Sequence, residues 1–117
     1  MNVHREGHSS CFIDGKLYVF CGINANKDPI NSIELLENAC GLLNAIRPWQ
    51  LIDMSSQQLA PRWMAATAPI NDSEIAIVGG LGFDVDIGEA AAMGDVVIFN
   101  TQTKATERRV RNLQGFT

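Results

Sequence analysis

Few side chains in this 117-residue sequence could carry chemistry, and the cysteines and histidines come first. The sequence has three cysteines, an odd number, and no CxxC pair, which favours reduced thiols over a disulfide framework and indicates a cytosolic setting. Zinc ligands could come from four residues near the N-terminus, His4, His8, Cys11 and Cys21. Their spacing matches no recurrent zinc pattern, so we predict no metal site and no cofactor.

Catalytic and nucleotide-binding patterns are also missing from the sequence. Neither histidine stands in a Ser-His-Asp or Cys-His order that a hairpin would bring together. The glycine-rich run at residues 79–82 lacks both the GxGxxG spacing of a dinucleotide site and the lysine of a phosphate loop. Asp84, Asp86 and Glu89 do not follow the spacing of an EF-hand calcium loop and are typical of solvated loop acids. We therefore predict that the chain is not an enzyme.

Composition narrows the class of protein further. Apolar residues make up 46% of the chain and charged residues 19%, which excludes a disordered tail. The net charge is −4 and the basic residues are scattered, which argues against a nucleic-acid binder. The longest apolar run, residues 75–83, is far shorter than the roughly 20 residues of a membrane-spanning helix. The first six residues have no apolar signal-peptide core, so we expect a cytoplasmic protein without a membrane partner.

An internal repeat organises the sequence. Arg5 opens the first copy and Arg62 opens the second, an offset of 57 in sequence number. Each copy then has small residues, an apolar run, a polar turn, a second apolar run and a pair of residues ending in glycine. These pairs are Cys21–Gly22 and Gly79–Gly80, at an offset of 58. A third apolar run follows at 33–36 and at 96–99, where the offset is 63, so length differences fall in turns and loops, as a repeated structural unit requires.

The turn and strand signals predict an all-β fold. Asp14–Gly15 between two apolar runs predicts a two-residue type I′ hairpin, which places Cys11 opposite Tyr18 and Ile13 opposite Lys16. The two nearby cysteines, Cys11 and Cys21, are then not partners across the hairpin. Third strands are expected at 32–38 and 95–100, and fourth strands at 49–52 and 106–110. We predict two units of four antiparallel strands, residues 1–59 and 60–117.

Helical alternatives exist at two places. Apolar residues at 33, 36, 40 and 43 have helical spacing, so a helix over 32–44 is an alternative to the third strand. The repeat favours the strand, because the matching segment 96–99 is short and β-branched. Residues 89–93 could form a helical turn inside the second loop.

The sequence resembles the kelch repeat over nearly its whole length, from residue 5 to about residue 110. The first copy has the matching features Arg5-x-x-His8, Leu17-Tyr18-Val19 before a glycine, Glu34 and Trp49. The second copy has Pro61-Arg62, the segment 75–80 ending in a double glycine, and the segment 95–100. The chain departs from the family pattern where Cys21 replaces a glycine and where the second copy lacks the histidine, the tyrosine and the late tryptophan.

The resemblance implies two four-stranded kelch-type blades of a β-propeller that acts as a binding platform. It implies a protein-interaction module, an adaptor or a cytoskeletal-type scaffold, with a protein partner held by loops on one face. A fragment of a sugar-acting kelch-fold isomerase or oxidase is the alternative, and a purely structural pair of blades is a third. Since propellers have four to eight blades, the chain is either part of a longer propeller or self-associates to complete one.

Five residues are candidates for binding the partner. Arg5 and Arg62 could direct their guanidinium groups at partner carboxylates or carbonyls, or could instead hold loop carbonyls and Glu34 of their own chain. The other candidates lie in the loops after the glycine pairs: Asn24 and Asn26 in the loop 23–30, and Phe83 in the loop 81–89.

Overall fold

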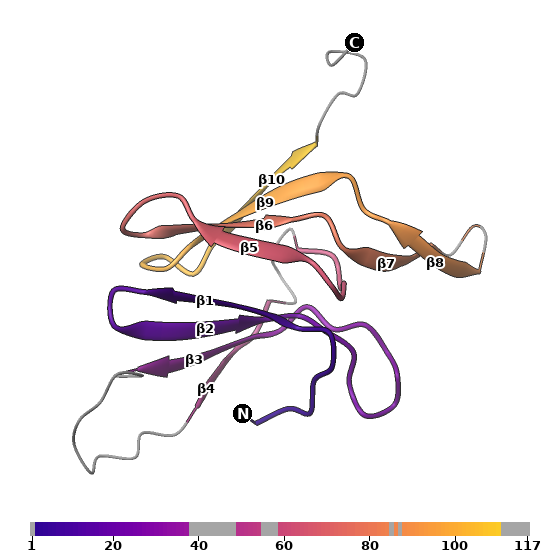
Figure 1. Ribbon diagram of the computed structural model, residues 1–117, viewed down its shortest axis with the longest axis horizontal. Coiled ribbons are helices and arrows are strands. Elements are labelled where there is room, and N and C mark those ends of the chain that lie inside the picture. Colours follow the sequence, from indigo (N-terminus) through magenta and orange to yellow (C-terminus); the bar gives the residue numbers. More distant parts are fainter. Residues whose placement is uncertain (1, 38–48, 55–58, 85, 87, 111–117) are drawn as a thin grey trace.

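The computed structural model describes residues 2–37, 49–54, 59–84, 86 and 88–110, and all of its regular structure is β (Figure 1). The first antiparallel sheet, in the order β1-β2-β3-β4, contains Ser9–Ile13, Lys16–Phe20, Ile33–Glu37 and Gln50–Ile52. The second, in the order β10-β9-β6-β5, contains β5 (Ala66–Pro69), β6 (Glu74–Val78), β9 (Asp95–Asn100) and β10 (Thr106–Val110). A separate hairpin contains β7 (Leu81–Asp84) and β8 (Glu89–Ala92). Among the residues described, no helix is long and apolar enough to span a membrane.

The predicted first hairpin is confirmed. Asp14 and Gly15 have φ values of 51° and 72°, as a type I′ turn requires. Cys11 pairs with Tyr18 and Ile13 with Lys16, in the predicted register. Cys11 and Cys21 are both buried free thiols, and Cys40 lies outside the described residues.

Both segments for which a helix was an alternative contain β-strands in the described structure. Residues 33–37 form strand β3 and residue 32 precedes it without helical structure, whereas residues 38–44 of the alternative helix lie outside the described residues. The helical turn at 89–93 is wrong, because Glu89–Ala92 is strand β8 and pairs with β7. A turn of this length cannot repay the cost of helix nucleation in isolation, whereas the β7 ladder satisfies the same backbone groups. The segment 81–89, expected as a polar loop, is therefore largely a β-hairpin that extends from the second sheet (Figure 1).

The core lies between the two four-stranded sheets. Tyr18 and Phe20 of β2 contact Phe99 of β9, with ring centroids 5.7 and 5.8 Å apart. Buried aliphatic side chains from both sheets complete one hydrophobic cluster. Polar links also join the sheets, since Thr67 Oγ1 donates to the carbonyl oxygen of Ser10 at 2.9 Å. The two sheets are thus packed as layers about a shared apolar interior.

The backbone repeats with the sequence. Glu6 and Ile23 form a two-way hydrogen-bonded bridge, with N–O distances of 2.9 and 2.8 Å. Trp63 and Leu81, which correspond to them at the offsets of 57 and 58, form the same bridge at 2.9 and 2.8 Å. The repeat detected in the sequence therefore corresponds to a repeated chain path at the start of each sheet.

Candidate functional site

Arg5, the first candidate, is buried and points into its own sheet. Its Nε donates to Oε2 of Glu34 at 2.9 Å, and both side chains are fully buried. Its Nη1 donates to the carbonyl oxygens of Cys21 and Ser32, both at 2.9 Å, and its Nη2 to Ser32 Oγ at 3.0 Å. Glu34 also accepts a hydrogen bond from the backbone N–H of Asn2. The Arg5 guanidinium is therefore committed to contacts within the chain.

Arg62 has the same kind of environment in the second sheet. Its Nη1 and Nη2 donate to the two carboxylate oxygens of Asp95 at 2.8 and 3.0 Å, a bidentate pair. Further hydrogen bonds go to the carbonyl oxygens of Gly79 and Ala60, both at 3.1 Å. Asp95 also accepts from Nε of Arg108 at 3.1 Å. Burial acts to raise the pKa of Asp95, but the hydrogen bonds and charges of Arg62 and Arg108 outweigh it and hold that pKa below its ordinary value.

These placements favour the structural alternative for both arginines. Arg5 is 5% exposed and Arg62 is 0% exposed, so neither guanidinium reaches the surface of the chain as it stands. The expected contact of Arg5 with Glu34 and loop carbonyls is present. Sequence reasoning missed Asp95 as the partner of Arg62. An acidic residue opening the third strand of the second copy was the available signal.

The two asparagines lie in the loop between β2 and β3. Asn24 Oδ1 accepts hydrogen bonds from the backbone N–H groups of Asn26 and Asp28, at 2.9 and 3.0 Å. This is an Asx-type turn, in which the side chain shapes its own loop. Lys27 in the same loop has a φ of 65°. Asn24 is half-buried and serves the loop, whereas Asn26 is exposed.

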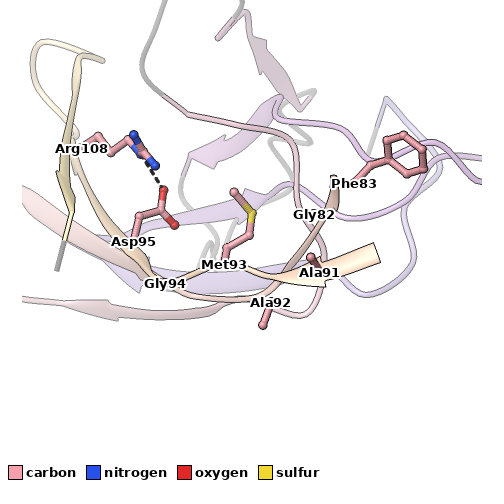
Figure 2. Close-up of a pocket in the computed structure, with 8 residues that line it drawn as sticks. All are labelled: Gly82, Phe83, Ala91, Ala92, Met93, Gly94, Asp95 and Arg108. Atoms are coloured by element: carbon pink, nitrogen blue, oxygen red, sulfur yellow. Dashed lines mark hydrogen bonds and ion pairs between the residues drawn. The ribbon is translucent and has the colours of Figure 1, made fainter. Parts of the chain in front are cut away.

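Phe83, the remaining candidate, lies on β7 and is 58% exposed. It lines an open cavity of about 390 Å³ at the β7–β8 hairpin, in which Met93 lies between Phe83 and the Asp95–Arg108 ion pair (Figure 2). The other residues drawn are small: Gly82, Ala91, Ala92 and Gly94. This concave surface is thus mostly apolar, with a paired charge at one end, and suits an apolar side chain of a ligand.

A second hollow of about 230 Å³ extends this surface toward the first sheet. Phe83 and Met93 line it as well, together with Pro29 from the loop 23–30 and Ala60–Pro61 from the connection between the sheets. The structure therefore brings Phe83 next to the end of the loop that carries Asn24 and Asn26. Neither asparagine is among the described lining residues of the two hollows.

The two cysteine thiols that the structure describes, Cys11 and Cys21, are both buried. Burial raises the pKa of Cys21 to about 11 and also raises the pKa of Cys11. Both thiols are therefore protonated near neutral pH and are poor nucleophiles. Within the part of the chain that the structure describes, no group of three or more His, Cys, Asp or Glu side chains could hold a metal ion.

The comparisons with known proteins concern the fold. No family model matches the sequence, and no curated protein matches it significantly. The solved structure of YjhT is similar, with a TM-score of 0.70 and 16% sequence identity. The similarity covers 93% of this chain but only 28% of YjhT, so this chain spans less than a third of that protein. At this identity the match is evidence about the fold alone, and it applies to both four-stranded sheets together.

Proposed function

We propose that the two four-stranded sheets are kelch-type propeller blades and that the chain is a protein-interaction module. In the first sheet the strands follow sequence order from one edge to the other, and the second has the same order once the inserted β7–β8 hairpin is set aside, as in a propeller blade. The arginine, the pair that ends in glycine and the third apolar run of the kelch-like pattern recur in both copies, at offsets that follow the strands. The similarity to YjhT is consistent with this, because that chain is long enough for about seven sheets of this size, within the four to eight blades of propellers.

The exposed aromatic ring of Phe83 beside an apolar hollow is the observation that carries the binding proposal. Exposed apolar surface next to a concavity marks interaction sites, and aromatic residues contribute a large share of interface energy. Phe83 lies on the segment between the second and third strands of the second blade. The kelch resemblance implies that this segment belongs to the ligand-binding face.

The β7–β8 hairpin also suggests how a partner binds. In the described structure this sheet has only two strands, and Trp63 already pairs with Leu81 at the outer edge of β7. The outer edge of β8 is therefore the one that offers backbone N–H and C=O groups to an added strand. The side chains of Ala90, Ala91 and Ala92 on β8 are small and leave room for an extended segment. We infer that the partner is an extended protein segment whose apolar side chain packs between Phe83 and Met93.

Peptide selection tests this proposal. Peptides are selected from a random library on the 117-residue chain, and their affinities are then measured for three proteins. These are the unmodified chain and two alanine variants. Replacing Phe83 with alanine (Phe83→Ala) is expected to weaken binding at least about tenfold, as for an aromatic anchor at an interface. The control is Phe12→Ala, which removes a ring of comparable exposure (48% against 58%) on β1, outside both hollows.

Two outcomes would contradict the binding proposal. One is selection that yields no peptide of reproducible affinity. The other is a set of peptides whose affinities fall equally for Phe12→Ala and Phe83→Ala, because this would indicate a general response to lost apolar surface.

A further inference from the structure

Each four-stranded sheet has an inner face, which packs on the other sheet, and an outer face. Tyr18 and Phe20 lie on the inner face of the first sheet, since both rings contact Phe99 of the second. On the second sheet the inner face includes Ile75 and Ile77, which are fully buried in the shared core. Because side chains alternate along a strand, Ala76 and Val78 lie on the outer face of that sheet.

Positions on the inner face of the first sheet correspond, in the repeat, to positions on the outer face of the second sheet. At the offset of 58, Tyr18 and Phe20 correspond to Ala76 and Val78, not to Ile75 and Ile77. The inner-face positions of the first sheet are therefore repeated on the outer face of the second. The contact between the two sheets is head-to-tail, and contacts of this type can be propagated into rings or filaments.

The outer face of the second sheet is apolar and partly open: Ala76 and Ile98 on it are buried, but other apolar side chains on it are exposed. Ile70 is 52% exposed, whereas its counterpart on the inner face of the first sheet, Ile13, is 8% exposed. Val78 is 44% exposed, whereas its counterpart Phe20 is 0% exposed. Two of these positions, Ile70 and Val78, are thus uncovered in the second sheet although their counterparts are buried in the first, whereas Ala76, the counterpart of Tyr18, is itself 8% exposed.

The outer face of the first sheet also carries exposed apolar side chains, next to the buried ion pair of Glu34 with Arg5. Phe12, Leu17 and Leu36 form one row across β1, β2 and β3. Phe12 is 48% exposed, and Leu51 of β4, in the adjacent row, is 50% exposed. Leu17 corresponds to Ile75, which is fully buried between the sheets. The outer face of the first sheet and the outer face of the second sheet are therefore the two surfaces of a second head-to-tail contact. Within the described structure neither of these faces is packed on another sheet.

A hydroxyl group supports the same pairing. In the observed contact between sheets, Thr67 Oγ1 donates to the carbonyl oxygen of Ser10. At the offset of 57, the counterpart of Thr67 is Ser10 itself, which also has a hydroxyl group. Ser10 is exposed and pairs with Val19, so its side chain lies on the outer face of the first sheet. From there it can donate the equivalent hydrogen bond to the Thr67 carbonyl of a neighbouring molecule.

We propose that a second copy of this chain occupies these faces, with the outer face of the first sheet docked on the outer face of the second sheet of its neighbour. Repetition of this contact produces a closed ring or a filament, depending on the rotation per copy. The proposal rests on the blade repeat of the proposed function. It does not depend on the Phe83 hollow, which lies on neither outer face.

Complementary variants test the direction of the contact. Phe12→Asp places a charge on the outer face of the first sheet, and Val78→Asp places one on the outer face of the second. Molar mass is measured by light scattering after size exclusion over a wide range of concentration. The unmodified chain is expected to exceed its monomer mass of 12.8 kDa as concentration rises. Each variant alone is expected to stay near 12.8 kDa, because every copy lacks the same face.

Mixing the two variants gives the decisive result. Each variant retains the face that the other has lost, so an equimolar mixture is expected to form a dimer of one copy each, and no larger species. Phe83→Asp is the matched control and should associate like the unmodified chain. Circular dichroism and thermal melting establish that all the variants are folded.

Three results would overturn the proposal. They are an unmodified chain that stays monomeric at every concentration, a mixture that forms no heterodimer, and single variants that still associate on their own. The last result would indicate like-with-like contacts or unspecific aggregation. A monomeric unmodified chain that still loses peptide binding through Phe83→Ala would leave the proposed function intact, so the two failures are distinguishable.

Discussion

The clusters around Arg5 and Arg62 are two versions of one arrangement. Both arginines stand before the first strand of their sheet and donate to corresponding carbonyl oxygens, those of Cys21 and Gly79. The acidic partner differs. Arg5 is paired with Glu34 inside β3, whereas Arg62 is paired with Asp95 at the start of β9. The arginine and its backbone acceptor are therefore the same in both copies, but the carboxylate comes from a different position of the repeat.

The geometry of a strand explains why the acidic partner can stand at different positions of the repeat in the two copies. At the offset of 63, Asp95 corresponds to Ser32, and both accept a hydrogen bond from Nη2 of their arginine. Glu34 lies two positions beyond Ser32, which in a strand is the next position on the same face. The longer glutamate side chain spans that extra distance back to Arg5. An alternating strand thus gives a buried arginine two places from which a counter-charge can come.

Removing either arginine should produce the largest loss of stability. Arg5→Ala and Arg62→Ala are each expected to lower the free energy of unfolding by about 3–5 kcal/mol, because each leaves a buried carboxylate without its main partner. Urea denaturation measures this difference. Arg109→Ala is the control, since the Arg109 side chain is 65% exposed and its ion pair is with the exposed Glu107, so it should change stability by less than about 1 kcal/mol. A small effect at one of the two buried arginines alone would contradict the equivalence of the clusters.

Neutralising the two carboxylates should distinguish the clusters. Asp95 accepts three charged hydrogen bonds from two arginines, at 2.8, 3.0 and 3.1 Å, whereas Glu34 accepts one from Arg5 at 2.9 Å and one from a backbone N–H. Asp95→Asn is therefore expected to cost about 3 kcal/mol and Glu34→Gln about 1.5 kcal/mol. Chemical denaturation of both variants measures the gap. Equal losses, or a larger loss at Glu34, would show that the number of arginine contacts does not set the strength of a cluster.

Local features of the fold, such as turns and single strands, could be predicted from the sequence. Features that depend on pairing with another segment of the chain could not. Asp14–Gly15 specifies its own hairpin through the left-handed conformation of both residues, and the register follows from that turn. The third strand of the second copy is similarly marked by its β-branched residues. By contrast, Ala90–Ala92 in β8 favours a helix by intrinsic propensity, and only the pairing with β7 overrides it.

The candidate site divides in the same way. Phe83 could be singled out as an apolar residue in a loop, because that judgement needs only local sequence. The orientation of Arg62 could not, because its partner Asp95 is distant in the sequence and becomes adjacent only when β6 and β9 pair. Arginine is equally suited to a surface contact and to a buried ion pair, so residue type alone does not separate the two.

The acid dependence of stability should sharpen the comparison at Asp95. Its folded-state pKa is lowered, so its ionised form stabilises the folded state above the unfolded pKa, near 3.8. That contribution is lost as the pH falls from about 4 through the lower folded-state pKa. The melting temperature of Asp95→Asn should therefore fall less steeply than that of the unmodified chain over this range. Asp72→Asn, at an exposed turn, should retain the steep fall, and an unchanged slope in Asp95→Asn would contradict the prediction.

The smallest expected effect concerns two equivalent backbone positions, Gly7 and Met64, which are related by the offset of 57. Their φ values are 65° and 59°, so both adopt the left-handed conformation, although only Gly7 does so without a Cβ clash. Met64 is 67% exposed, so its side chain contributes little to the core. Met64→Gly is therefore expected to stabilise the chain by about 1 kcal/mol, and Gly7→Ala to destabilise it by about the same amount.

The control for this pair is Met64→Ala, which removes the long side chain and keeps the Cβ. If the backbone conformation is the cause, Met64→Ala should give none of the gain of Met64→Gly in thermal melting. At Gly7 an added Cβ would meet only ordinary contacts, the nearest at 3.4 Å from Cβ of Trp63, so the expected loss there comes from the left-handed φ and not from crowding. Equal stability of Met64→Ala and Met64→Gly would mean that the side chain, not the backbone, distinguishes the second copy from the first at this position.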